Sequence, residues 1–85
     1  MIHFVVTIKD RAIDTFLRPV CYPSLGAAIR EFADEINNPQ SPMNKHPDDY
    51  DLYHVATYDD VRGAFANTPE PNQIAIGKNA ILTKH

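Results

Sequence analysis

The feature that most constrains the fold of this chain is an amphipathic segment in its first half. Apolar residues recur there at helical spacing: Leu25, Ala28, Ile29, Phe32, Ala33 and Ile36. Such a stripe predicts one helix with a single buried face. Ser24 suits the N-cap, because its hydroxyl can accept a hydrogen bond from a free amide of the first turn. Pro39 ends the helix, because proline disfavours helical geometry in the residue before it.

Segments on both sides of this helix alternate between apolar and polar residues, which is typical of half-buried strands. Residues 2–9 are the clearest case. Residues 15–22 suit a second strand, and Pro19 restricts it to a sheet edge or a bulge because proline has no backbone donor. After the helix, a connector over 39–49 leads to a strand over 50–58 and a turn over 59–63. A short strand over 64–66, a loop over 68–72 and a last short strand over 73–76 follow.

This order of elements predicts an α+β fold, with a single domain over residues 1–85. The expected arrangement is β-β-α-β-β, with room for a fifth strand, in one small antiparallel sheet. A helix packed on one face of the sheet would bury the apolar stripe and one side of each strand. A partly open, OB-like barrel of the oligonucleotide-binding kind is the alternative, since it also uses about five short strands.

The composition limits where such a protein works. Apolar residues make up 44% of the chain, as in ordinary globular domains. No apolar run approaches the ~20 residues of a membrane span, so we expect no membrane partner. The N-terminus lacks the basic flank and apolar stretch of a signal peptide. One cysteine, Cys21, has no internal disulfide partner, which fits a reducing cytoplasm.

No group of residues has the spacing of a catalytic or cofactor site. The histidines lack the i, i+4 spacing of metal ligands: His3, His46, His54 and His85. Cys21 has no catalytic signature around it and is expected to be a small buried side chain. The acidic clusters at 48–51 and 59–60 lack the central glycine and terminal glutamate of a calcium loop. We therefore expect a non-enzymatic protein without metal or cofactor.

Charge is distributed unevenly along the chain, which carries a net charge of −3. The first thirty residues hold four basic residues against two acids, whereas residues 31–60 hold eight acids and only Lys45. A basic face and an acidic face are compatible with this pattern. Nucleic-acid binders usually show a basic footprint, so the net charge alone favours a protein partner.

Four short motifs in the middle of the chain resemble one known family. They are Ala28-Ile29-Arg30-Glu31-Phe32, Asn37-Asn38-Pro39, the segment 46–53 (His-Pro-Asp-Asp-Tyr-Asp-Leu-Tyr), and Tyr58-Asp59 through Gly63. Their order and separation resemble the non-structural protein of the gokushoviruses, small single-stranded DNA phages of the microvirus group. The resemblance covers about residues 24–63, with a looser match of the first strand. It implies a DNA-binding protein of the host cytoplasm, linked to single-stranded genome synthesis.

Aromatic residues on the predicted strands are the candidates for a nucleic-acid site: Tyr22, Tyr50, Tyr53, Tyr58 and Phe65. Strand alternation predicts that Tyr50 and Tyr58 share one face and that Tyr53 takes the other. Tyr53 would then stack on bases, and nearby cations would contact phosphates: Lys9, Arg18, Arg62 and Lys78. The alternative is that the tyrosines only cover the core, with their hydroxyls at the surface.

Two residues of the helix motif are assigned structural roles. Phe32 is a core residue, and the resemblance implies that Arg30 anchors the connector by pairing with Asp48, Asp49 or Asp51. The expected partners are single-stranded DNA and a second copy of the chain, joined through an unpaired edge strand. The alternative is a protein-interaction module that contacts phage replication or capsid proteins through its acidic face.

Overall fold

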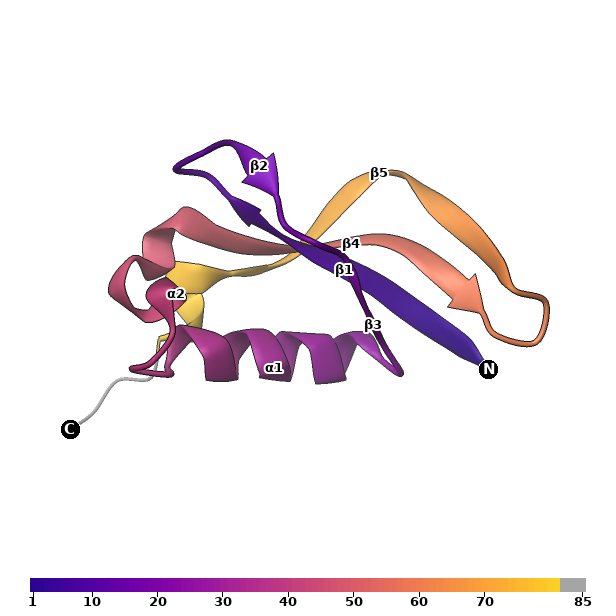
Figure 1. Cartoon of the computed structure of the whole chain (residues 1–85), viewed down its shortest axis with the longest axis horizontal. Coiled ribbons are helices and arrows are strands. Elements are labelled where there is room, and N and C mark those ends of the chain that lie inside the picture. Colours follow the sequence, from indigo (N-terminus) through magenta and orange to yellow (C-terminus); the bar gives the residue numbers. More distant parts are fainter. Residues whose placement is uncertain (82–85) are drawn as a thin grey trace.

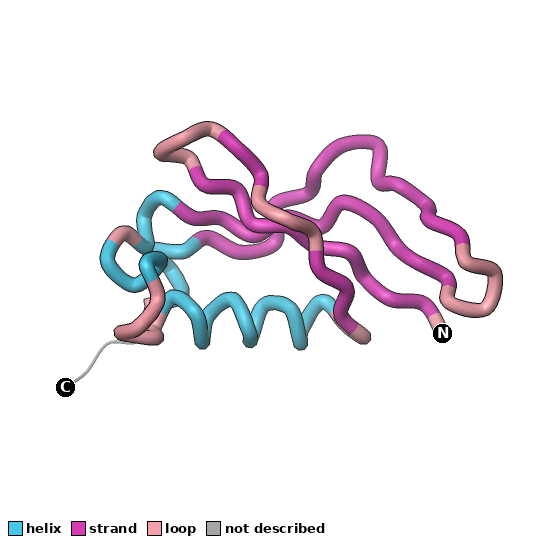
Figure 2. The backbone as a smooth tube through the Cα atoms, in the orientation of Figure 1, coloured by secondary structure: helices cyan, strands magenta, loops and turns pink. Residues whose placement is uncertain are grey.

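The computed structural model describes residues 1–81 and shows an α+β fold, as the sequence predicts (Figure 1). One antiparallel sheet curves over a single long helix, which covers one of its faces (Figures 1 and 2). The elements in chain order are β1 (Ile2–Asp10), β2 (Thr15–Phe16), β3 (Val20–Tyr22), α1 (Leu25–Ile36), α2 (Pro42–Lys45), the 3₁₀ turn η1 (Pro47–Asp49), β4 (Tyr50–Asp59), β5 (Ala64–Ile76) and the 3₁₀ turn η2 (Gly77–Ala80).

The sheet has the strand order β2-β1-β4-β5, and β3 pairs with β1 further along the same edge. The predicted strand 15–22 is thus two short strands rather than one. Between them, the Leu17 amide still donates to the Ile8 carbonyl, and pairing stops before Pro19. Proline has no amide hydrogen to donate to a neighbouring strand. Pro19 therefore lies at a sheet edge, between two paired segments, as the sequence predicts.

Helix α1 begins and ends where the sequence predicts. Ser24 has an extended backbone, and its hydroxyl accepts a hydrogen bond from the Ala27 amide at 3.1 Å. Asn37 is the C-cap, and its side-chain amide donates to the carbonyls of Ala33 and Ala80 at 2.7 and 2.8 Å. The cap therefore also fixes the end of η2 beside the helix.

The core lies between α1 and the sheet, around Val6, Ala28, Phe32, Ile36, Met43 and Leu52. Phe32 is only 3% exposed, which confirms its core position. One member of the predicted stripe differs: Ile29 is 37% exposed and lies at the border of the core. The sheet therefore buries the middle of the apolar helix face, at Ala28, Phe32 and Ile36, and leaves Ile29 at its border partly exposed.

Two predicted loops contain regular structure. The connector 39–49 forms α2 and η1, and Ser41 caps α2 by accepting from the Met43 amide at 3.2 Å. The predicted loop 68–72 is part of β5, which leaves β4 after Asn67 and rejoins it at Asn72. Pro69 and Pro71 cannot donate to β4, so the strand bulges there instead of ending.

A second irregularity decides which side chains share a face. Val5 pairs with Ala56, but Val6 pairs with His54, so Val55 is an extra residue in β4. The extra residue shifts the alternation of the strand. Tyr53 and Tyr58 pair with Thr7 and His3, two residues of the same β1 face. The prediction that Tyr53 and Tyr58 point to opposite faces is therefore wrong.

Candidate nucleic-acid interface

The sheet face that points away from α1 carries most of the partly exposed aromatic side chains. We call it the aromatic face and define it by the cross-strand rows of alternate β1 residues: His3 with Tyr58 and Phe65, Val5 with Cys21 and Ala56, Thr7 with Tyr53 and Gln73, and Lys9 with Phe16 and Asp51. Tyr50 pairs with Asp10 and packs against the core on the helix side.

One cluster on this face is formed by Phe16, Tyr53 and Lys9. The rings of Phe16 and Tyr53 are edge to face, with centroids 5.3 Å apart and an interplanar angle of 75°. The Lys9 ammonium lies 5.3 Å from the Phe16 ring centroid, within the range of a cation–π contact. Gln73 donates a long hydrogen bond of 3.4 Å to the Tyr53 hydroxyl. Phe16 is 40% exposed, so this cluster presents ring surface to solvent.

A second cluster lies at the other end of the same face. The Tyr58 ring is 4.7 Å from the Phe65 centroid and 6.3 Å from the His3 centroid. Phe65 is 64% exposed, although it belongs to a strand. Lys9 and His3 are six steps apart along β1, so the clusters are separated by about 20 Å. Between them the face is buried, with Val5, Thr7 and Ala56 at most 7% exposed.

The predicted phosphate-binding cations are only partly brought together. Lys9 lies in the first cluster and forms an ion pair with Asp14 at 3.1 Å. Arg62 is exposed in the β4–β5 turn, close in sequence to the second cluster. Arg18 lies at the β2–β3 edge and Lys78 in η2, outside both clusters. Within residues 1–81, the side chains of Arg18, Arg62 and Lys78 form no hydrogen bond or ion pair.

The connector is anchored by Arg11, not by Arg30 as the family resemblance implies. The Arg11 guanidinium pairs with the Asp51 carboxylate at 3.1 Å and donates to the Asp48 carbonyl, and its amide donates to the Asp49 carbonyl at 2.8 Å. The Asp51 side chain is 5% exposed, so its charge needs such a partner. Arg30 is exposed on α1, and its side chain has no ion pair within the described residues.

The Asp60 carboxylate borders the second cluster and holds two partners. Asp60 accepts from the Met1 amine at 2.7 Å and contacts His3 Nε2 at 2.8 Å. These hydrogen bonds, first to the amine and then to His3, hold the pKa of Asp60 below its ordinary value. The same contact to Asp60 raises the pKa of the Met1 amine. The start of β1 is thereby tied to the β4–β5 turn.

Other chemistry finds little support in the part of the chain that the structure describes. No group of three or more His, Cys, Asp or Glu in residues 1–81 could hold a metal ion. Cys21 is exposed on β3, so the expectation that it is buried is wrong. None of the helices in these residues is long and apolar enough to cross a membrane.

The sequence reasoning missed two residues: Phe16, which lies on the aromatic face, and Arg11, which anchors the connector. Phe16 and Arg11 lie on either side of the turn between β1 and β2, where Asp14 has a positive φ of 53°. A tight hairpin with Lys9 opposite Phe16 would have placed both. The signal was weak, because only two residue pairs join β1 to β2.

The fold and the aromatic face together define a small α+β protein in which one sheet face packs on a helix and the other carries two partly exposed aromatic clusters. Comparison with protein families then gives one match: the family described as Phage ORF5 protein matches residues 3–80. The chain belongs to this phage family. The match extends beyond the motif segment 24–63 and includes the C-terminal strand β5 and η2. Neither the curated proteins nor the solved structures give a match.

Proposed function

We propose that this phage protein is a non-enzymatic, gokushovirus-type non-structural protein that binds single-stranded DNA on its aromatic face. It would act in the host cytoplasm during viral genome synthesis or packaging. The observation that supports this most is the placement of two aromatic clusters on one face, with Phe16 and Phe65 exposed by 40% and 64%. Contiguous exposed apolar surface is typical of binding sites, and each cluster joins its rings into such a surface.

The clusters suit unpaired bases better than a duplex. Every base has two π-faces that can stack on an aromatic ring, whereas paired bases within a helix are already stacked on one another. A stretch of about 20 Å between clusters is in keeping with a strand of several nucleotides, since single-strand sites commonly span about 4–16. Lys9 and Arg62 would contact phosphates at the two ends.

The test is a fluorescence-anisotropy titration with a 5′-fluorescein-labelled oligo-dT strand, repeated across a series of salt concentrations. The proposal expects saturable binding that weakens as salt increases, and poor competition by a duplex of the same length. No binding at low salt, or equal affinity for duplex and single strand, would contradict it.

The second candidate function is a protein-interaction module that contacts phage replication or capsid proteins. It is favoured by the net charge of −3 and by the internal pairing of Lys9 with Asp14 and Arg11 with Asp51. The first pair reduces the cationic character of the first cluster, and the second reduces that of the connector beside β4. The same titration separates the two functions, because a protein module with an acidic binding surface would show no affinity for the oligonucleotide at low salt.

A further inference from the structure

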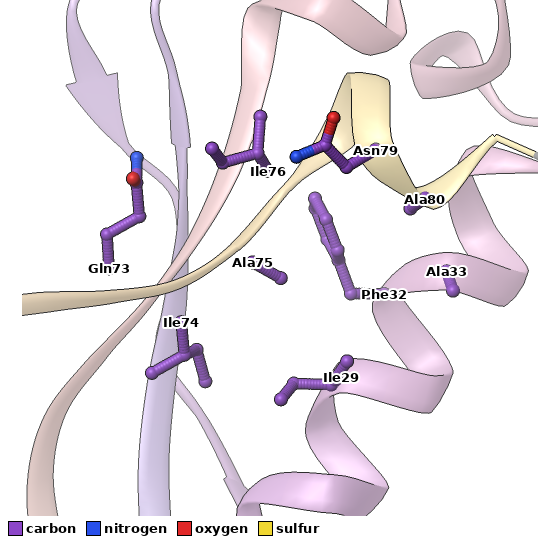
Figure 3. A pocket seen from close by; sticks show the side chains of 9 residues that line it. All are labelled: Ile29, Phe32, Ala33, Gln73, Ile74, Ala75, Ile76, Asn79 and Ala80. Atoms are coloured by element: carbon purple, nitrogen blue, oxygen red, sulfur yellow. The ribbon is translucent and has the colours of Figure 1, made fainter.

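Within residues 1–81, β5 is an outer strand of the sheet, and its apolar end, residues 74–76, lies beside α1. A groove of about 430 Å³ runs between them and is lined on the helix side by Ile29, Phe32 and Ala33 (Figure 3). Ile74 and Ala75 line the opposite wall, and both side chains face the helix in Figure 3. Two consecutive side chains can face the helix because β5 has an extra residue there. Leu52 pairs with Ala75 and Tyr53 with Gln73, so Ile74 is unpaired.

The last five residues of the strand that borders this groove have the composition of a pairing edge. β5 is the last strand of the described sheet, and residues 72–76 read Asn-Gln-Ile-Ala-Ile, without charge or proline. Edge strands that stay unpaired are usually protected by charges or prolines. The opposite edge shows that protection, because β3 has three residues enclosed by Pro19 and Pro23. The two edges of the sheet therefore differ in what they can accept.

We propose that the occupant of this groove edge is a second copy of the chain, with the two β5 strands antiparallel across a two-fold axis near Ile74. Such an interface is isologous, so each surface must be complementary to itself. The uncharged segment 72–76 meets this condition, since antiparallel pairing places identical uncharged segments against each other. The two α1 helices then lie on the same side of the joined sheet, and Ile29 and Ala33 of each border the shared groove.

The charges beside the groove on α1 are also self-complementary. Arg30 follows Ile29, and Asp34 follows Ala33, one helical turn further on. Both side chains are exposed, and neither forms an ion pair within residues 1–81. In an antiparallel helix pair, Arg30 of one copy faces Asp34 of the other, and the reciprocal pair forms on the second side of the axis. This arrangement gives Arg30 a partner that the single chain does not provide.

The dimer has a consequence for the proposed function, and this step rests on that function. A two-fold axis perpendicular to the sheet leaves both aromatic faces on one side, away from both helices. The clusters of the two copies would then form one extended surface for a single strand. The self-association itself does not depend on DNA and is measured without it.

The experiment is sedimentation-velocity ultracentrifugation of the purified chain without DNA, over a range of micromolar concentrations. We expect a concentration-dependent dimer, and a dissociation constant raised about tenfold or more by Ile74→Lys. Val20→Lys is the matched control, because Val20 is a half-exposed valine on the opposite edge, and it should leave the dimer unchanged. Circular dichroism confirms that each variant is folded.

A charge exchange tests the interface without touching the core. Arg30→Asp should weaken the dimer, and the double variant with Asp34→Arg should restore it, because the reciprocal pair is then inverted. A monomeric wild-type chain would overturn the proposal, as would a dimer that Val20→Lys disrupts and Ile74→Lys does not. A dimer without affinity for oligo-dT would refute only the DNA-binding function, and a monomer that binds DNA would refute only the dimer.

Discussion

Phe16 lies edge-on to Tyr53, with ring centroids 5.3 Å apart, although 37 residues separate them in the chain. β1 lies between their strands and holds both in register, since Lys9 pairs with Phe16 and Thr7 with Tyr53. The contact fixes the orientation of the Tyr53 ring and leaves Phe16 40% exposed. A base that stacks here would meet two rings already held in position, so little ordering is needed on binding.

The first prediction concerns Tyr53. Tyr53→Ala should weaken oligo-dT binding by about 1–3 kcal/mol, because one stacking platform is lost. Tyr53→Phe is the matched control and should bind nearly as well as the wild type, since it keeps the ring and loses only the weak bond from Gln73. Anisotropy titrations of folded variants measure both. An unchanged affinity for Tyr53→Ala would remove this residue from the site.

The second prediction concerns the cations. Few basic residues border the clusters, so the salt dependence of oligo-dT binding should be shallow, with each phosphate contact contributing about −0.7 to the slope. Lys9→Gln and Arg62→Gln should each flatten the slope by about that amount. Lys78→Gln serves as the control, because Lys78 lies in η2, outside both clusters. An equal change of the salt slope in all three variants would indicate a general effect of net charge and not phosphate contacts at Lys9 and Arg62.

The helix and the strand segments could be predicted from the sequence because their periodicity is local. The stripe around Phe32 and the cap at Ser24 depend only on near neighbours in the chain. The shared face of Tyr53 and Tyr58 could not be predicted, because it depends on one extra residue, Val55, opposite β1. A bulge of this kind leaves no compositional mark in the strand that carries it.

The candidate site was predicted less completely for the same reason. Tyr53 and Lys9 come together only through strand register, which pattern alone does not determine. Arg11 reaches Asp51 across a sequence separation of forty residues, so a local motif around Arg30 gave the wrong anchor. Long-range pairing therefore decided the anchor at Arg11 and the contact of Phe16 with Tyr53, which local patterns do not show.

The third prediction concerns the core. Phe32→Ala should destabilise the fold by about 3–5 kcal/mol, as truncation of a buried phenylalanine does. Phe65→Ala is the matched control, because Phe65 is 64% exposed and its loss should cost far less. Chemical denaturation followed by circular dichroism compares the two. Equal stability of both variants would be incompatible with the packing of α1 on the sheet.

The fourth prediction concerns pH. Because the pKa of Asp60 is lowered in the folded state, its ionised form stabilises the fold above its ordinary value of 3.8. This contribution is lost as the pH falls through the lowered pKa. Asp60→Asn should therefore melt below the wild type at neutral pH, and the two should converge at a pH below the lowered pKa of Asp60. A difference in melting temperature that stayed constant down to that pH would exclude the contacts of Asp60 with the Met1 amine and His3 as its cause.

The last prediction concerns Gly77, the first residue of η2. A Cβ atom there would lie 2.1 Å from the Pro47 carbonyl oxygen and 2.5 Å from that of Tyr50, so the backbone of η1 and the start of β4 would have to move. Gly77→Ala should destabilise the fold by about 1–3 kcal/mol or more, as overpacking does.

Gly63→Ala is the control for a backbone effect without a clash, because Gly63 has a φ of +65° and a Cβ atom added to it would have no neighbouring atom within 4 Å. Its cost should be about 1–2 kcal/mol, the ordinary penalty of a left-handed residue. Denaturation curves of both variants, with hydrogen exchange at the Tyr50 and Asp51 amides, separate the cases. Faster exchange at these amides in Gly77→Ala alone would locate the strain between η1 and β4, and a Gly77→Ala protein as stable as the wild type would refute the close packing of η2 against η1.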